Sequence, residues 1–328
     1  MIEIRDLSVD YVVSGGGRVR ALRSVSLSLS RGESAAVVGE SGCGKSTLAL
    51  ALIGLLPVNA ETKGCVEIGG VCITGKKHAE LAGIRGKQAG MIFQEPSSSL
   101  NPVFTVKEQI EETIIAHEPS VDRKSLGSRG RKLLEEAGIT DIDRVYNSYP
   151  HQLSGGQQQR VMAAIALSCN PGLLIADEPT TALDVTVQAQ IIELLKRLKK
   201  ERELTLLLIT HDLHLGLELC SRVIVMYAGE VVEDAVMRGE KDAAHPYTRA
   251  LFEVIPRIGG GKSGFRVIPG ELPEPGSGFE ACAFAPRCSR SQEKCFKEHP
   301  EMEPVPRGMC RCFFPYTDTE ALKRRSNA

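Results

Sequence analysis

The chain has 328 residues, of which 42% are hydrophobic and 25% are charged, so it can form one large and one smaller domain around a substantial core. Its 40 basic and 41 acidic residues give a formal net charge of −1, so the chain lacks the basic excess typical of a non-specific nucleic-acid binder. The longest apolar stretch, residues 48–58, is interrupted by Gly54 and Pro57 and is shorter than the roughly 20 residues that span a bilayer. The first ten residues carry acids and no apolar signal core, so we expect a cytosolic chain that reaches a membrane only through partners.

Residues 39–47, with the sequence GESGCGKST, match the phosphate-loop pattern G-x-x-x-x-G-K-[ST]. The apolar run 35–38 predicts a buried strand before the loop, and residues 47–56 predict a helix after it. In such a loop the backbone N–H groups and the helix N-terminus face the phosphates. Lys45 would neutralise β- and γ-phosphate charge, and the Ser46 hydroxyl would bind Mg²⁺. The predicted nucleotide contacts here are Gly39, Ser41, Gly42, Cys43, Gly44, Lys45, Ser46 and Thr47.

Residues 96–160 lack a strand pattern and are rich in helix formers, which predicts a helical insertion within an α/β domain. Near its end, the pentapeptide LSGGQ at 153–157 precedes a predicted helix that reaches about residue 167. Ser154 is a natural N-cap, and the two glycines after it leave backbone amides open toward an anion. An ordinary capped helix after a glycine turn would show the same local pattern.

The run LLIADE at 173–178 predicts a buried strand that delivers two acids at its C-terminal end, where ligands of open α/β sheets bind. Asp177 would hold Mg²⁺ through its water shell, and Glu178 would accept a proton from the attacking water. Two more apolar runs, 206–209 and 223–226, predict further buried strands. Between the two acids and the run 206–209, residues 187–202 predict an amphipathic helix with a basic, solvated face.

Beyond about residue 240, Pro and Gly become frequent and regular periodicity fades. We therefore predict a nucleotide-binding domain at 1–240, with its helical subdomain at about 96–160, and a loop-rich extension at 241–328. His245 at the boundary is expected to cap or pack rather than to bind a metal.

The cysteines fall into two groups. We expect each scattered one to be a small buried residue, namely Cys43, Cys65, Cys72, Cys169 and Cys220. The others crowd into the last fifth of the chain: Cys282, Cys288, Cys295, Cys310 and Cys312. In a cytosolic protein such crowding favours a metal site over disulfides, although the spacing lacks the C-x₂-C pairs of zinc ribbons.

Together these motifs resemble the nucleotide-binding subunit of ABC transporters. The resemblance implies an α/β P-loop NTPase core of the ABC type with a mixed sheet, a helical subdomain insertion and a small cysteine-containing extension. It also implies further site residues: Gln94 as the Q-loop glutamine that senses Mg²⁺ and contacts the membrane subunit, 182–184 as the D-loop, and His211 as the switch histidine on the γ-phosphate. Tyr11 lies where the family stacks an aromatic ring on adenine, although a Tyr near a first strand can also simply pack.

In this family two such subunits face each other, and each ATP is held between the phosphate loop of one chain and the LSGGQ of the other. The resemblance therefore implies that LSGGQ residues act on the nucleotide of the facing chain. These residues are Ser154, Gly155, Gly156 and Gln157.

Three segments resemble one branch of the family, the oligopeptide/dipeptide and nickel importers. They are QEPSSSLNP at 94–102, HPYTRAL at 245–251, and the cysteine block. The resemblance implies a [4Fe–4S] cluster with a structural role, held by Cys282, Cys288, Cys295 and Cys312. Cys310 is the alternative fourth ligand, and structural zinc or free thiols are the alternatives to the cluster.

The function implied is ATP binding and hydrolysis, coupled to uptake of di- or oligopeptides at the cytoplasmic face of the cell membrane. The implied partners are a second, related ATPase, two membrane permease subunits and an extracytoplasmic substrate-binding protein, with no nucleic acid. Nickel or another small solute is an alternative cargo, because the ATPase of this architecture does not touch the cargo. A soluble ABC ATPase of DNA repair or translation is disfavoured, since this chain has one phosphate loop, one LSGGQ and no long coiled-coil insertion.

Overall fold

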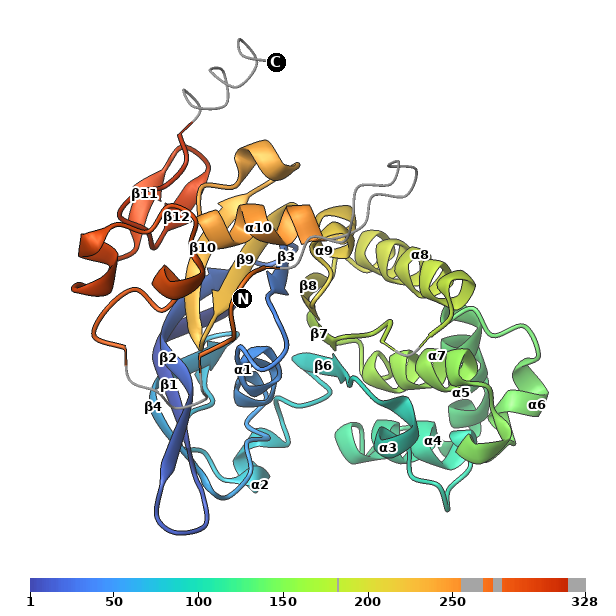
Figure 1. The fold of residues 1–328 in the computed structure, drawn as a ribbon. Helices are drawn as coiled ribbons and strands as arrows, with labels where there is room; N and C mark the ends of the chain where they lie inside the picture. Colours follow the sequence, from blue (N-terminus) through green and yellow to red (C-terminus); the bar gives the residue numbers. More distant parts are fainter. Residues whose placement is uncertain (182, 255–267, 274–278, 318–328) are drawn as a thin grey trace.

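The computed structural model describes residues 1–181, 183–254, 268–273 and 279–317, and its centre is an eight-stranded mixed sheet (Figure 1). The strand order is β11-β12-β10-β9-β3-β8-β7-β6, with β9, β3, β8, β7 and β6 parallel and the other three antiparallel. The bounds are β3 (Ser34–Val38), β6 (Ala89–Ile92), β7 (Leu173–Asp177), β8 (Thr205–Thr210), β9 (Arg222–Tyr227), β10 (Glu230–Val236), β11 (Glu303–Val305) and β12 (Gly308–Cys310). All four predicted apolar runs are therefore confirmed as strands of one sheet, and the mixed α/β architecture is confirmed with them.

The central strands are apolar throughout because both faces of the sheet are covered. In β3, Ala36 and Val38 pack into one hydrophobic cluster, whereas Ala35 and Val37 pack into another on the opposite face. The first face is covered mainly by α7 (Gly155–Ala166), α8 (Val185–Glu201), α9 (Leu213–Leu219) and α10 (Pro246–Val254). The other face is covered by α1 (Lys45–Leu52) and by a second sheet.

That second sheet is antiparallel, with the order β2-β1-β4-β5. Its strands are β1 (Ile2–Val12), β2 (Arg18–Leu29), β4 (Ala60–Ile68) and β5 (Val71–Cys72), and α2 (His78–Leu81) follows it. Helix α1 ends at Leu52, before the predicted end at residue 56, because Gly54 adopts a left-handed φ of 64° that an α-helix cannot contain.

The helical region between β6 and β7 forms a separate lobe with its own core (Figure 1). It contains α3 (Pro96–Ser99), α4 (Val106–His117), α5 (Arg123–Glu136), α6 (Ile142–Tyr146), the 3₁₀ turn η1 (Pro150–Gln152) and α7 (Gly155–Ala166). Thr105 caps α4 by accepting a hydrogen bond from the Glu108 N–H, and Asp122 caps α5 in the same way from Lys124. The predicted helical character of 96–160 thus agrees with the structure.

Residues beyond 240 include α10, the 3₁₀ turns η2 (Glu240–Asp242), η3 (Ala285–Arg287) and η4 (Glu293–Phe296), and the two strands β11 and β12. Strand β12 pairs with β10, placing Cys310 opposite Glu233, so the extension completes one edge of the main sheet. The boundary near residue 240 therefore stays a prediction, and it would cut a continuous sheet. No helix in the described ranges is long and apolar enough to cross a membrane.

The five scattered cysteines differ in how deeply they are buried. Cys43 and Cys220 are buried as expected, but Cys65, Cys72 and Cys169 are only partly buried, so that prediction is wrong for these three. Cys65 and Cys72 lie on the β4–β5 hairpin at the edge of the second sheet, where their sulfurs are 3.8 Å apart. An edge hairpin leaves side chains partly in solvent, which the sequence pattern around a lone cysteine does not reveal.

Candidate nucleotide-binding site

The phosphate loop connects β3 to α1 through a backbone shape that only glycine allows at two points. Gly44 has a φ of 104°, and a Cβ there would lie 2.6 Å from the Ala21 carbonyl oxygen. A Cβ on Gly39 would lie 2.3 Å from the carbonyl oxygen of Met226. Lys45 is 5% exposed, and its Nζ donates to the Gly39 and Glu40 carbonyls at 2.8 and 3.0 Å. The loop is therefore wrapped around its own lysine at the N-terminus of a helix, an arrangement that suits phosphate.

The end of β7 meets the start of α1. Ser46 Oγ lies 3.4 Å from Asp177 Oδ1, and Asp177 is only 4% exposed. Burial raises the pKa of Asp177 to about 6, and the neighbouring Glu178 charge adds to the increase. A hydroxyl and a carboxylate oxygen at this spacing are donors of the kind that Mg²⁺ accepts.

Glu178, at the end of β7, contacts side chains that follow the strands on either side of it, β6 and β8. Its Oε2 accepts hydrogen bonds from Gln94 Nε2 at 3.2 Å and from Thr181 Oγ1 at 2.8 Å, and it lies 3.3 Å from His211 Nδ1. Gln94 and His211 lie just beyond the ends of β6 and β8, so the three carboxyl ends of the strands bring these groups together. Glu178 itself has a φ of 44°, a conformation that costs energy for a non-glycine residue and is typical of functional sites.

Sequence reasoning missed Thr181, because a threonine in a loop has no pattern that would distinguish it. Tyr11, which the family resemblance assigned to adenine, has its hydroxyl 3.2 Å from Thr47 Oγ1, a contact that joins β1 to α1, and its stacking on adenine stays a prediction. The structure therefore brings Tyr11, the loop, Gln94, the two acids and His211 into one region of the chain.

The LSGGQ segment lies elsewhere. Ser154 Oγ accepts the Gln157 N–H at 3.3 Å, and Gln157 Oε1 accepts the Ser154 N–H at 3.2 Å, forming a capping box at the start of α7. A Cβ on Gly156 would lie 2.7 Å from Val187 Cγ1 on α8, and one on Gly155 would be an ordinary 3.8 Å from a neighbouring leucine. In Figure 1, α7 belongs to the helical lobe and lies apart from α1. The structure therefore does not bring Ser154 to Lys45 of the same chain.

Part of the predicted D-loop is also described. Ala182 lies outside the described residues, whereas Leu183 and Asp184 lie within them. Asp184 caps α8, because its Oδ1 accepts the Val187 N–H at 2.9 Å. The D-loop thus leads directly into the helix that contacts Gly156.

In the extension, four cysteines line one cavity with aromatic residues: Cys282, Cys288, Cys295 and Cys312. Backbone N–H groups point at two of the sulfurs, from Arg290 to Cys288 and from Phe314 to Cys312, both at 3.4 Å. Burial raises the pKa of the Cys282 thiol to about 11 and that of Cys312 to about 12. Even so, no group of three or more His, Cys, Asp or Glu side chains in the described part of the chain is arranged to hold a metal ion. The predicted cluster therefore stays a prediction.

Cys310 and His245 have other surroundings. Cys310 is buried on β12 and does not line this cavity, whereas His245 does. Nδ1 of His245 accepts the N–H of Tyr247 at 3.0 Å, and its ring packs on Phe284. Complete burial lowers the pKa of His245 to about 3. His245 therefore caps and packs, as predicted.

Comparison with known proteins shows which family the chain belongs to. The model of the ABC transporter family matches residues 22–181, and that of the oligopeptide/dipeptide transporter C-terminal region matches residues 239–295. The chain is 42% identical to the oligopeptide transport ATP-binding protein AppD of Bacillus subtilis (strain 168), over 95% of this chain and 96% of the relative. It is also 42% identical to the putative peptide import ATP-binding protein BMEII0206 of Brucella melitensis, over 95% and 94% of the two chains.

A solved structure agrees with these relatives. The dimeric structure of the ATP-binding cassette MJ0796, in a post-hydrolysis state bound to ADP and Pi, has a TM-score of 0.65 and 33% identity. It covers 73% of this chain and 100% of the cassette. The chain therefore belongs to the ATPase subunits of ABC transporters, in the group that carries the oligopeptide/dipeptide transporter C-terminal region.

Proposed function

We propose that this chain hydrolyses ATP to drive the import of di- or oligopeptides. The observation that carries the proposal is the convergence of Gln94, Thr181 and His211 on Glu178, beside the phosphate loop. The cargo is inferred from the relatives, which match nearly the whole chain and are named for peptide transport. Because they share the C-terminal region as well as the ATPase core, they favour a peptide over nickel or another small solute.

Each nucleotide-site residue has a proposed role. Lys45 binds the β- and γ-phosphates together with the backbone N–H groups of the loop, and Tyr11 stacks on adenine. Ser46, Asp177 and Gln94 hold Mg²⁺, which when bound neutralises phosphate charge. Glu178 accepts the proton of the attacking water, supported by its hydrogen bonds from Gln94 and Thr181 and by the nearby His211 ring. His211, which is largely exposed and faces Glu178, contacts the γ-phosphate.

The LSGGQ residues serve the nucleotide of a facing chain. The position of Ser154 in the helical lobe, apart from α1, supports this assignment, as does the dimeric state of the similar cassette. Following the family resemblance, the facing chain is a related ATPase. A dilute isolated chain is then expected to bind ATP but to hydrolyse it slowly, with a rate per chain that rises with protein concentration.

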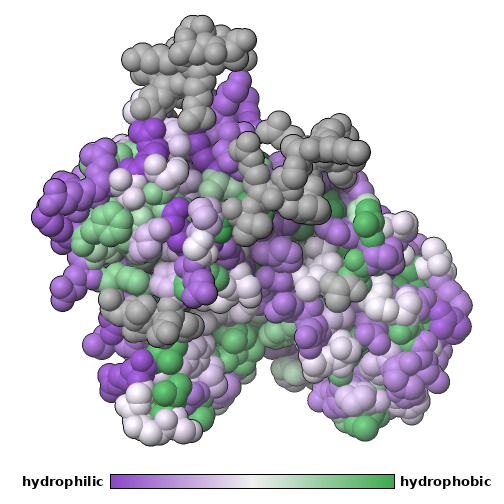
Figure 2. All heavy atoms as spheres, in the orientation of Figure 1, coloured by the Kyte–Doolittle hydropathy of each residue, from purple (hydrophilic) through white to green (hydrophobic). Residues whose placement is uncertain are grey.

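A groove beside Gln94 is the proposed contact with one of two membrane permease subunits. It has a volume of about 260 Å³ and runs between the main sheet and the helical lobe. Its lining includes Met91, Phe93, Leu100, Phe104, Gln109 and Met162. Figure 2 shows this face hollowed between the two lobes, with hydrophobic residues at the inner end of the hollow. Docking there keeps the chain at the cytoplasmic face of the membrane, while an extracytoplasmic substrate-binding protein delivers the cargo to the permeases from the opposite side.

We further propose that the cysteine cavity holds a [4Fe–4S] cluster, with zinc as the alternative. The donor set supports it: four thiols share one cavity, and two of the sulfurs face backbone N–H groups. Bound there, the group would act as a structural staple for a loop-rich region. Iron and sulfide assays on anaerobically purified protein test this, with Cys312→Ser expected to lose iron and Cys310→Ser expected to keep it. Zinc instead of iron would overturn the cluster.

The transport function is tested by reconstituting the chain with its permeases, partner ATPase and binding protein. Peptides are expected to stimulate ATP hydrolysis, and nickel is expected not to. Stimulation by nickel alone would establish the alternative cargo. Full activity without any membrane subunit would instead favour a soluble ABC ATPase.

A further inference from the structure

Two side chains of the C-terminal extension reach back to the phosphate loop and bind the same residue, Glu40. The Arg287 guanidinium holds the Glu40 carboxylate from two nitrogens, with Nη1–Oε2 at 2.7 Å and Nη2–Oε1 at 3.1 Å. The Tyr247 hydroxyl accepts the backbone N–H of Glu40 at 2.9 Å. Both the side chain and the backbone of one loop residue are therefore held by residues beyond position 240.

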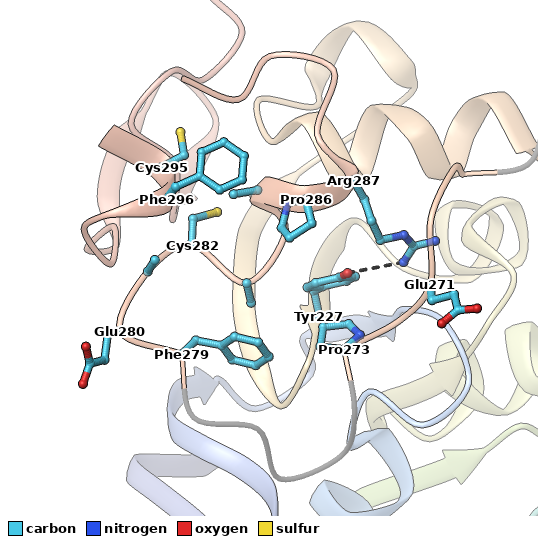
Figure 3. A pocket seen from close by; sticks show the side chains of 13 residues that line it. Tyr227, Glu271, Pro273, Phe279, Glu280, Cys282, Pro286, Arg287, Cys295 and Phe296 are labelled. Atoms are coloured by element: carbon cyan, nitrogen blue, oxygen red, sulfur yellow. Dashed lines mark hydrogen bonds between the residues drawn. The ribbon is translucent and has the colours of Figure 1, made fainter. Parts of the chain in front are cut away.

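Arg287 is a rigid anchor because each of its donors has an acceptor. A guanidinium has five N–H groups. Besides the two bonds to Glu40, Nε donates to the Pro269 carbonyl at 3.0 Å, Nη2 to the Ile268 carbonyl at 3.3 Å, and Nη1 to the Tyr227 hydroxyl at 3.3 Å (Figure 3). Its side chain is only 4% exposed, so solvent does not weaken these bonds.

Tyr247 is equally fixed. Its ring is fully buried, packs edge-on against Tyr227 with ring centroids 4.7 Å apart, and makes a tilted contact with Phe284 at 5.2 Å. Tyr227 also receives the Arg287 hydrogen bond, so the two anchors share one aromatic support. The hydroxyl that meets Glu40 therefore has a single position.

Glu40 connects these anchors to the lysine of the loop. Its carbonyl oxygen accepts Lys45 Nζ at 3.0 Å, next to the bond from Lys45 to Gly39. A shift of Glu40 would thus move an acceptor of the side chain that binds the phosphates. We propose that Arg287 and Tyr247 are positioning residues of the ATP site, which hold the phosphate loop in its binding conformation through Glu40. This inference rests on the proposed binding of ATP by the loop.

Two mild substitutions test the inference in the full-length chain. Arg287→Lys keeps the charge but loses the paired contact, and Tyr247→Phe removes one oxygen and keeps the ring. Each is expected to weaken ATP binding about tenfold, because one or two hydrogen bonds that order the loop are lost. In the reconstituted complex KM for ATP rises by a similar factor, whereas kcat stays within about twofold.

The matched controls are an arginine and a tyrosine that make comparable hydrogen bonds to acidic side chains elsewhere in the chain. Arg222 makes a paired contact with Asp234, at 2.7 Å from both nitrogens, and Tyr146 donates its hydroxyl to Glu111 at 2.6 Å. Arg222→Lys and Tyr146→Phe remove comparable bonds and are expected to leave ATP affinity unchanged. In the Glu40→Gln background, Arg287→Lys is expected to cause little further loss, because Arg287 acts through Glu40.

The outcomes separate this inference from the proposed function. If the native chain binds ATP and both variants bind it equally well, the anchors only attach the extension and the positioning role is wrong. If the native chain does not bind ATP, the proposed function fails, and the inference with it. Should Arg287→Lys fail to fold, the affinity of Tyr247→Phe decides alone.

Discussion

The phosphate-binding edge of the sheet and the start of α7 carry the two kinds of nucleotide contact expected in this family, but they are built differently. At the sheet edge, functional groups from different strands contact each other, as when Gln94 and His211 meet Glu178. At the start of α7, the side chains of Ser154 and Gln157 each accept the other residue's backbone N–H, as in an ordinary helix cap. The sheet-edge half of the proposed site is therefore assembled within one chain, whereas the α7 half is left to contact the nucleotide of a facing chain.

This difference predicts how the two regions respond to substitution. Groups that contact each other at the sheet edge should affect either the binding or the hydrolysis of the nucleotide held by their own chain. Groups that only cap a helix should affect turnover only when a second chain faces them. Four experiments, taken from the largest expected effect to the smallest, test this distinction.

Glu178→Gln is expected to have the largest effect. The amide can keep the contacts with Gln94 and Thr181 but cannot accept a proton from water, so ATP turnover in the complex should fall by about 10² to 10⁴-fold. ATP binding by the isolated chain is the control and should persist. Turnover near the native rate would remove Glu178 as the general base.

Gly44→Ala should disrupt the loop itself. The left-handed φ is expected to lower the free energy of unfolding by about 1–2 kcal/mol, and the contact with the Ala21 carbonyl by a further 1–3 kcal/mol. Urea unfolding measures this loss, and an ATP titration measures the accompanying loss of affinity. Gly15→Ala is the matched control, since Gly15 has a φ of 94° but a Cβ added there would have no atom within 4 Å. Equal losses in the two variants would show that φ alone, and not the close contact, requires Gly44.

The raised pKa of Asp177 predicts a pH-dependent stability of the nucleotide-free chain. The pKa rises from 3.8 to about 6 on folding, so the fold favours the protonated carboxyl. This contribution is fully present below pH 3.8 and is lost as the pH rises through about 6, by at most about 3 kcal/mol. Asp177→Asn cannot ionise, so the difference in unfolding free energy between the two proteins should change across this window and level off above it. Parallel pH profiles would contradict the assignment.

Ser154→Ala should have the smallest effect on the isolated chain. Loss of the cap is expected to cost about 1 kcal/mol of unfolding free energy and to leave ATP binding unchanged. Thr105→Ala removes the equivalent capping box from α4 and serves as the control. In the complex, only Ser154→Ala should reduce turnover beyond what stability explains. Equal turnover in the two variants would indicate that Ser154 caps its helix and does nothing more.

Much of the sheet edge was predictable because its residues follow local patterns. Apolar runs of four residues between loops predict buried strands, and parallel strands present their carboxyl ends at one edge. Asp177 and Glu178 directly follow such a run, so their position near the phosphate loop followed from the order of residues. Thr181 was missed because its contact with Glu178 depends on the path of a loop.

The extension was less predictable because its contacts join distant parts of the chain. Nothing in the residues around Cys310 shows that β12 pairs with β10, and the choice of Cys312 over Cys310 for the cavity came from the family resemblance and not from the spacing. The bonds from Arg287 and Tyr247 to Glu40 span more than 200 residues. Short strands and 3₁₀ turns have weak intrinsic preferences, so tertiary packing decides where they lie.

By itself, the sequence determined the phosphate loop, the acids at the end of β7, the capped helix after LSGGQ and the resemblance to one family. These features depend on hydrophobic periodicity and on backbone geometry within a few residues, which local sequence controls. Only the tertiary structure decided that Glu178 gathers three partners and that the extension holds Glu40. Such contacts form between elements brought together by burial of their apolar faces, and burial is a property of the whole chain.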